Sequence, residues 1–166
     1  MSERNGTVVC PGTYDPVTLG HVDIITRTAN VFDKVVVGVV NNPLRKNKTL
    51  FTAEERKAFI ETATADLGNV EVQIFSTLLV EFARQNDAHA IVKGMRAISD
   101  FEYEFEMAQL NRKLDPEIES IYVIASPHYS FLSSTGVKEM ATFGGDVSDL
   151  VPAPVAAAMA NRLGDR

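Results

Sequence analysis

The stretch Lys34-Val-Val-Val-Gly-Val-Val40 is almost continuously valine and has no polar residue after its first position. β-branched residues favour strands, and a strand that is apolar on both faces is typical of a parallel sheet with helices on either side. Before it, Val22, Ile25, Ala29 and Phe32 recur at helical spacing. This region therefore predicts an α/β protein built on a parallel sheet.

Short β-branched runs alternate with amphipathic segments along the rest of the chain. The predicted strands are Thr7–Cys10, Lys34–Val40, Val70–Phe75, Ala90–Lys93 and Ser120–Ala125. The predicted helices cover 18–32, 52–66, 78–86, about 99–114, 134–143 and 154–163, with capping boxes at Thr52–Glu55 and Ser99–Glu102. Because right-handed crossovers place helices on both faces, this order predicts a doubly wound, five-stranded parallel sheet. The chain has no repeat or linker, so we expect residues 1–166 to form a single domain.

Composition and charge exclude several classes of function. The chain has 16 Lys+Arg against 22 Asp+Glu, a formal net charge of −6, which argues against a nucleic-acid binder or a polybasic membrane-surface protein. The single cysteine, Cys10, excludes an internal disulfide and is typical of a reducing compartment. No apolar run is long enough for a membrane span or a secretory signal. We therefore expect a soluble cytoplasmic protein without a nucleic-acid or membrane partner.

Polar segments follow four of the five predicted strands. In a doubly wound sheet, ligands bind beyond the carboxyl ends of the strands, so these segments should meet at one cleft. They are residues 11–21, 41–48, 93–96 and 126–138. Their cations predict a small basic pocket on an acidic body, suited to anionic substrates. These cations are Arg45, Lys46, Lys93, Arg96 and Lys138.

The first of these segments, Pro11-Gly-Thr-Tyr-Asp-Pro-Val-Thr-Leu-Gly-His21, carries groups that suit a phosphate. Gly12 lets a ligand approach the backbone, and Thr13 offers a hydroxyl and an amide. His21 falls in a first helical turn, where an imidazole can donate to a phosphate oxygen. The alternative is a turn followed by a histidine that only caps the helix.

Two later segments have the same character. Lys93-Gly-Met-Arg96 offers a point charge and a planar fork for phosphate oxygens. Ser133-Ser-Thr135 leads into a helix whose hydroxyls and amides can surround a triphosphate. The alternatives are a surface turn and simple N-capping, in which Ser134 can serve both purposes. Glu104, taken alone, has the pattern of an exposed helix residue.

Residues 11–21 resemble the signature of the nucleotidyltransferase superfamily, His/Thr-x-Gly-His, here with Thr18 in the first position. Lys93–Arg96, Asp100–Glu104, Tyr129–Thr135 and Val137–Glu139 resemble one branch of it, the phosphopantetheine adenylyltransferases. The resemblance implies a Rossmann-like nucleotidyltransferase fold over about residues 7–163. It also implies reversible transfer of the adenylyl group of ATP to 4′-phosphopantetheine, giving dephospho-CoA and pyrophosphate. Mg²⁺ bound through the ATP phosphates rather than by side chains, CoA as a feedback inhibitor and a homohexamer are further implications.

The resemblance also implies roles for individual residues. His21 would stabilise the transition state, with Thr13 and Lys93 as the other catalytic residues. The residues implied for ATP are Thr13, Tyr14, His21, Gly94, Met95, Arg96, Glu104, Tyr129, Ser130, Phe131, Leu132, Ser133, Ser134 and Thr135. Those implied for phosphopantetheine are Thr13, Arg45, Leu79 and Lys93.

The chain departs from the family pattern at three of these positions. Arg45 stands where a lysine is expected and Lys46 follows it, so either cation can be the one that meets the acceptor. Lys93 replaces a frequent arginine, and Thr135 replaces a frequent serine while keeping the hydroxyl.

Two other functions remain open at this stage. One is another nucleotidyltransferase, adenylating nicotinamide mononucleotide or using CTP on an alcohol phosphate. The other is a non-catalytic nucleotide sensor. Release of pyrophosphate with a given acceptor distinguishes all three. No nucleophile–base pair is evident in the sequence, and a phosphate acceptor, whose second pKa is about 6, needs no general base at neutral pH.

Overall fold

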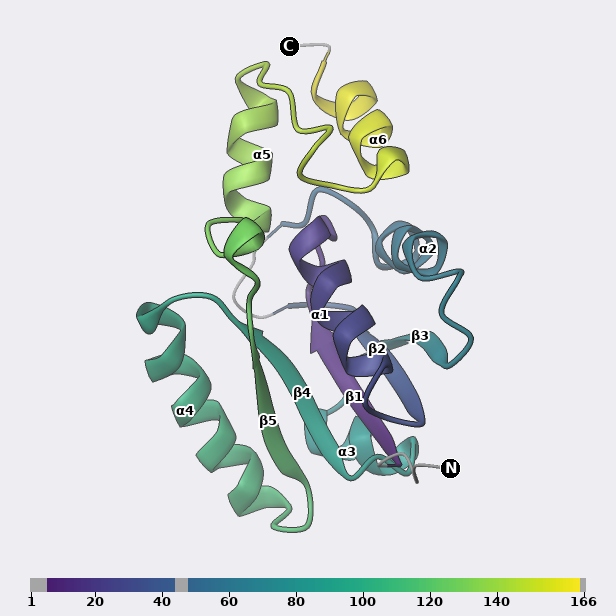
Figure 1. The fold of residues 1–166 in the computed structure, drawn as a ribbon, viewed down its shortest axis with the longest axis vertical. Coiled ribbons are helices and arrows are strands. Elements are labelled where there is room, and N and C mark those ends of the chain that lie inside the picture. The colour runs from purple at the N-terminus through teal and green to yellow at the C-terminus, as the bar shows by residue number, and fades with distance from the viewer. Residues whose placement is uncertain (1–5, 44–47, 165–166) are drawn as a thin grey trace.

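The computed structural model describes residues 6–43 and 48–164, in which strands and helices alternate as predicted (Figure 1). The strands are β1 (Thr7–Gly12), β2 (Lys34–Val40), β3 (Val70–Phe75), β4 (Ala90–Met95) and β5 (Glu119–Ile124). The helices are α1 (Leu19–Ala29), α2 (Ala53–Ala63), α3 (Leu79–Gln85), α4 (Ile98–Leu114), α5 (Ser134–Thr142) and α6 (Ala153–Leu163). A short 3₁₀ helix, η1 (Pro127–Tyr129), is the one described element that the sequence pattern did not predict.

The five strands pair in parallel in the order β3-β2-β1-β4-β5. In the register of β1, Cys10 lies opposite Val37, and on its other side Val9 lies opposite Ile91 of β4. The chain proceeds from β1 to one edge of the sheet and then returns to place β4 beside β1. The strand order therefore reverses between β1 and β4, which is where parallel sheets form their ligand sites. The predicted fold class is confirmed.

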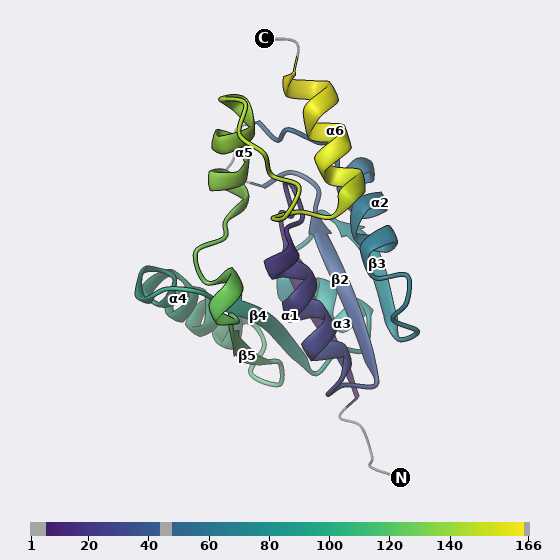
Figure 2. The same cartoon turned by 45° about the horizontal axis from the view of Figure 1, so that its top comes forward.

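Alternate residues of the buried strands face two apolar cores. Val8 and Val37 belong to the core that contains α1, α2, α5 and α6, whereas Val9 and Val36 belong to a smaller core with α3. Figure 2 shows α1 in front of the sheet and α3 behind it. Helices α5 and α6 lie together beyond the carboxyl ends of the strands (Figure 1).

Strands β1 and β4 each run two residues past their predicted ends. Gly12 lies opposite Val39 of β2, and Met95 lies opposite Ile124 of β5, so the ladders with the neighbouring strands hold these residues extended. As a result, Thr13 and Arg96 follow the strand ends directly.

Two helix starts differ from their predicted form. Helix α4 begins at Ile98 rather than after a Ser99 cap, because the Asp100 carboxylate accepts from the N–H groups of Arg96 and Ala97 at 3.1 and 3.2 Å. The cap of α5 is Ser133, which accepts from the Gly136 N–H, whereas the Ser134 hydroxyl donates to the Pro16 carbonyl at 2.7 Å. The predicted box at Thr52 and Glu55 is confirmed.

Helix α4 has an apolar face that the described part of the chain leaves exposed. Phe101 and Phe105 stack on each other with ring centroids 5.8 Å apart, and both are about half exposed. Ile98, Leu110 and Leu114 are exposed as well, while the buried residues of this helix are Glu104 and Asn111. Phe101 and Phe105 therefore do not belong to the core of the described chain. No helix in the described ranges is both long enough and apolar enough to cross a membrane.

Candidate active site

A cavity of about 390 Å³ lies at the point where the strand order reverses, beyond the ends of β1 and β4. Segments that follow β1, β4 and β5 line it together, which confirms the predicted convergence for three of the four polar segments. The predicted site residues that line it are Thr13, Tyr14, His21, Lys93, Gly94, Arg96, Glu104, Tyr129, Leu132, Ser133, Ser134 and Thr135.

Four other described residues that are implied for the substrates do not line this cavity, and their roles stay predictions. Leu79 packs beside the smaller core at the start of α3, and Met95 does not line the cavity. The Ser130 hydroxyl donates to Pro127 within the 3₁₀ turn, and the side chain of Phe131 is 72% exposed. Arg45 and Lys46 lie outside the described residues, so their contacts with an acceptor remain a prediction.

His21 both caps α1 and lines the cavity. The Thr18 N–H donates to Nδ1 of His21 at 2.9 Å, and the His21 N–H donates to the Thr18 hydroxyl at 3.3 Å. A backbone N–H can only donate, so Nδ1 carries no proton, and in the neutral ring the proton is on Nε2. The capping bond thus orients the imidazole as a donor through Nε2. The capping alternative is confirmed, and the role of His21 toward a phosphate stays a prediction.

Each described cation of the predicted basic pocket has a carboxylate partner. Lys93 Nζ lies 2.6 Å from Glu104 Oε1, and Arg96 Nε lies 3.7 Å from Asp100 Oδ2 while its Nη1 donates to the Leu132 carbonyl. The cavity lining among the described residues therefore carries equal numbers of cations and carboxylates, and the expectation of a basic pocket is wrong for this part. Lysine has three donors, so Lys93 can meet an anion while it keeps Glu104.

Glu104 is 8% exposed, so the interpretation of an exposed helix residue is wrong. Its Oε1 pairs with Lys93, and its Oε2 is buried with no hydrogen-bond partner in the ranges that the structure describes. The Tyr122 hydroxyl donates to the Glu104 main-chain carbonyl at 3.0 Å, which fixes this turn of α4 against β5. The pair therefore stands at the wall of the cavity with unused acceptor capacity.

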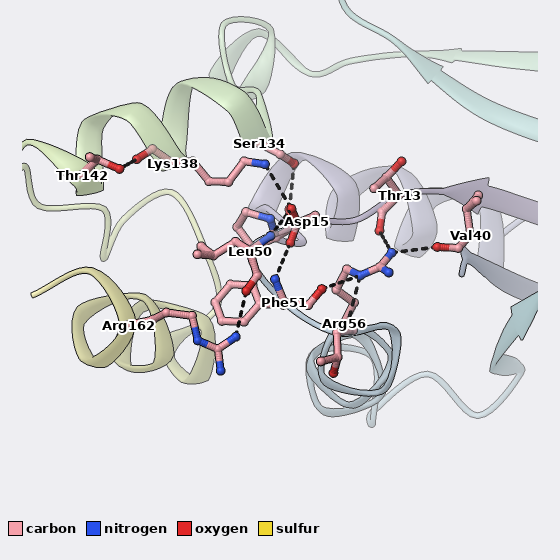
Figure 3. A network of polar contacts seen from close by, with 12 residues as sticks. Thr13, Asp15, Val40, Leu50, Phe51, Arg56, Ser134, Lys138, Thr142 and Arg162 are labelled. Atoms are coloured by element: carbon pink, nitrogen blue, oxygen red, sulfur yellow. Dashed lines mark hydrogen bonds and ion pairs between the residues drawn. The ribbon is translucent and has the colours of Figure 1, made fainter. Parts of the chain in front are cut away.

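Asp15, which belongs to the loop that follows β1, forms the centre of a buried polar network (Figure 3). Its side chain is 0% exposed and accepts from the Leu50 and Phe51 N–H groups at 2.8 and 2.9 Å. The Lys138 ammonium lies 3.1 Å from Asp15 Oδ2. Lys138 therefore joins α5 to the loop and is not among the cavity-lining residues, contrary to its predicted place in the basic pocket.

Arg56 is a second buried charge on the same side of the loop (Figure 3). Its Nη1 donates to the carbonyls of Thr13 and Val40 at 2.7 and 2.9 Å, and its other nitrogens donate to the carbonyls of Asn41, Phe51 and Thr52. Burial lowers the pKa of the guanidinium, and the charge of Asp15 opposes that shift. Our sequence reasoning missed both residues. The available signal was a charge at 56 on the helix face that also carries Phe59 and Ile60.

Cys10 and Tyr14 line the cavity but have no reactive form at neutral pH. Burial raises the pKa of the Cys10 thiol to about 12, and it raises the pKa of Tyr14 well above its ordinary value. The Tyr14 hydroxyl donates to the Cys10 carbonyl at 3.0 Å. Both groups therefore stay protonated, and neither serves as a nucleophile or a base.

The glycine at the end of β1 has an explanation within the chain. A Cβ at Gly12 would lie 2.9 Å from the Tyr14 ring, closer than real Cβ atoms approach. Gly12 therefore makes room for the buried tyrosine, in addition to any approach by a ligand.

Comparison with known proteins agrees with this geometry. The sequence model of the cytidylyltransferase-like family matches residues 9–140. The phosphopantetheine adenylyltransferase of Heliobacterium modesticaldum is 51% identical over 157 residues, 95% of this chain and 92% of that protein. The same enzyme of Rubrobacter xylanophilus is 54% identical over 144 residues, 87% of each chain. A solved structure, described as a putative nicotinate-nucleotide adenylyltransferase from Vibrio parahaemolyticus, has a TM-score of 0.66 at 16% identity and covers 95% of this chain and 92% of its own. That likeness shows the fold alone.

Proposed function

The chain belongs to the phosphopantetheine adenylyltransferases of the cytidylyltransferase-like family, and on this premise we propose that its cavity transfers the adenylyl group of ATP to 4′-phosphopantetheine. The products are dephospho-CoA and pyrophosphate, and the reaction, which belongs to coenzyme A biosynthesis, is reversible. One observation carries the proposal. Thr13, His21, Lys93 and Ser133, which come from three distant segments, line one cavity where the strand order reverses.

In the proposed reaction, an oxygen of the acceptor's phosphate forms a bond to the α-phosphorus of ATP. The bond from that phosphorus to the oxygen bridging to the β-phosphate breaks, and its electron pair leaves with pyrophosphate. The attacking phosphate is largely ionised at neutral pH because its second pKa is about 6. No proton has to be removed, which agrees with the protonated states of Cys10 and Tyr14.

The residues of the chain act by position and by charge in this proposal. His21 donates through Nε2 to an α-phosphate oxygen as negative charge develops there, and the Thr13 hydroxyl donates beside it. Lys93 holds the acceptor's phosphate. Arg96, with Ser133–Thr135 at the start of α5, holds the β- and γ-phosphates. The support is that the capping bond from Thr18 fixes the imidazole tautomer and that all these groups line one cavity.

Mg²⁺ enters the proposal as a companion of ATP. Among residues 6–43 and 48–164, no group of three or more His, Cys, Asp or Glu side chains is placed to hold a metal ion. Of the cavity's two carboxylates, Asp100 accepts from two N–H groups and Glu104 is paired with Lys93 through Oε1. Phosphate oxygens are ligands that Mg²⁺ prefers, so a phosphate-bound ion fits this lining. When bound, it screens the negative charge of the triphosphate.

We also propose that the protein is a cytoplasmic homohexamer inhibited by CoA. The exposed apolar face of α4 supports self-association, because a subunit interface would remove the apolar surface of its phenylalanines and leucines from water. CoA contains the pantetheine arm of one substrate and the adenosine of the other, so it suits the same cavity. Light scattering should give a mass about six times 18.2 kDa, and added CoA should slow the reaction. A monomeric mass would contradict the proposed hexamer, and a reaction rate unchanged by CoA would contradict the proposed inhibition.

A coupled pyrophosphate assay tests the function. Wild-type protein with ATP, Mg²⁺ and phosphopantetheine should release pyrophosphate, while nicotinamide mononucleotide with ATP, and an alcohol phosphate with CTP, should give only background. Activity with either of those other pairs would replace the proposed acceptor. ATP binding without pyrophosphate from any acceptor would indicate a nucleotide sensor.

A further inference from the structure

Arg56 is a fully buried charge whose hydrogen-bond partners in the described part of the chain are all main-chain carbonyls. Its side chain is 1% exposed, and within the described residues no carboxylate lies within ion-pair distance of it. The five carbonyls come from three segments: Thr13 after β1, Val40 and Asn41 at the end of β2, and Phe51 and Thr52 before α2. Burying a charge is costly unless it is well hydrogen-bonded, and here the planar fork meets acceptors in several directions. The guanidinium thus ties these segments together.

The shortest of these contacts reaches the cavity wall from behind. Thr13 and Tyr14 line the cavity, whereas Arg56 does not. The Thr13–Tyr14 peptide is planar and trans, so its N–H points opposite to its carbonyl. Because the carbonyl points at Arg56 at 2.7 Å, the Tyr14 N–H points away from it. Among the described residues, no acceptor meets that N–H.

The conformation that this peptide adopts has to be held. Tyr14 has φ of 52°, in the left-handed region that a non-glycine residue rarely occupies. Such a conformation persists where the surroundings over-determine it. Here the Tyr14 hydroxyl is tied to Cys10 on one side and the Thr13 carbonyl to Arg56 on the other. Loss of the guanidinium fork would let the peptide turn toward a more common conformation.

We propose that Arg56 is a positioning residue for adenylyl transfer, which aims the Thr13 hydroxyl and the Tyr14 N–H at the α-phosphate by fixing the peptide between them. The proposal rests on the proposed function. Arg56 itself touches no substrate. Its contribution is geometric, and it is therefore felt in the rate of transfer more than in the binding of ATP.

The test is Arg56→Lys, which keeps the charge and loses the fork. We expect kcat to fall about 10- to 100-fold, since a displacement of about 1 Å can cost that much, while the Kd of ATP changes less than about threefold. The matched control is Arg162→Lys. Arg162 also donates to a loop carbonyl, that of Leu50, and to Glu55, but it does not reach Thr13. The Arg162→Lys substitution should lower the melting temperature and leave kcat unchanged.

Wild-type kcat in a folded Arg56→Lys variant would overturn the proposal, and so would an equal loss in both variants. If Arg56→Lys does not fold, the wild-type protein supplies the answer through the ¹⁵N–¹H signals of the Arg56 guanidinium, assigned through the side-chain bonds. A hydrogen bond from the Tyr14 N–H to the α-phosphate should polarise the Thr13–Tyr14 peptide and so change the bond between the Thr13 carbonyl and Arg56. These signals should therefore shift on addition of Mg²⁺ with α,β-methylene-ATP, and unmoved signals would overturn the proposal. Absence of pyrophosphate release by the wild type would instead count against the proposed function.

Discussion

The two sides of the loop from Gly12 to Thr18 use charge in opposite ways. On the cavity side, Lys93 and Glu104 form a partly exposed pair whose second carboxylate oxygen has no partner in the described residues. On the α2 side, Asp15 and Arg56 are buried, and their polar groups contact the backbone of several segments. The cavity side thus keeps a hydrogen-bond acceptor available for a ligand, whereas the polar groups on the α2 side are used in hydrogen bonds that fix the loop. Substitutions on the two sides should therefore give different kinds of loss.

The largest effect should come from Asp15. Asp15→Ala leaves two buried N–H groups and the Lys138 ammonium without their acceptor, and breaking a buried charge network in this way costs about 3–5 kcal/mol. Urea unfolding measures the free energy directly. Lys138→Met, which removes one partner and leaves both amide bonds, should cost clearly less. A loss below about 1 kcal/mol for Asp15→Ala would show that this side does not hold the loop.

His21 should show the reverse pattern, a loss of rate with little loss of stability. His21→Ala should lower kcat by about 10²-fold or more, equal to about 2.7 kcal/mol, as for other transition-state donors, with the Kd of ATP nearly unchanged. The comparison variant is His21→Asn, whose amide oxygen can still accept from the Thr18 N–H but cannot reach the position of Nε2. It should be as slow as His21→Ala. Full activity of the Asn variant would mean that His21 only caps α1.

Lys93 lies on the cavity side as well, but its expected role is binding. Lys93→Met should raise the KM for phosphopantetheine about tenfold, in line with the loss of one charge-assisted hydrogen bond, and change the KM for ATP less. Lys93→Arg keeps the charge and should retain most of the acceptor affinity. An equal rise in both KM values would indicate that the lysine serves mainly to neutralise Glu104.

How far the sequence predicts each side depends on the distance over which its contacts act. The bounds of β2 and β3 match the prediction because their apolar pattern is local. The convergence of the cavity segments follows from topology alone. The partner of each charged side chain does not follow from topology. Lys138 and Asp15 are 123 positions apart, and only the packing of α5 against the loop brings them together. Arg56 was missed for a second reason: its partners are main-chain carbonyls, which every residue has, so no residue type in the sequence marks them.

The smallest effect should come from the pair that attaches α6 to α2, because it is partly exposed and far from the cavity. Arg162 Nη2 lies 2.6 Å from Glu55 Oε1, and the bonds from Arg162 lower the pKa of Glu55 to about 2 from an ordinary 4.5. The folded state therefore favours the carboxylate. This contribution is fully present above pH 4.5 and is lost as the pH falls from 4.5 to 2.

Glu55→Gln should make the melting temperature fall less steeply across that window, leaving a residual slope from Glu71, Asp115 and Asp146, whose pKa values are also lowered. High salt should reduce the difference between variant and wild type. A profile identical to wild type would show that α6 is held by its apolar contacts alone, and a change in kcat at neutral pH would place this distant pair, against expectation, among the contacts that fix the loop.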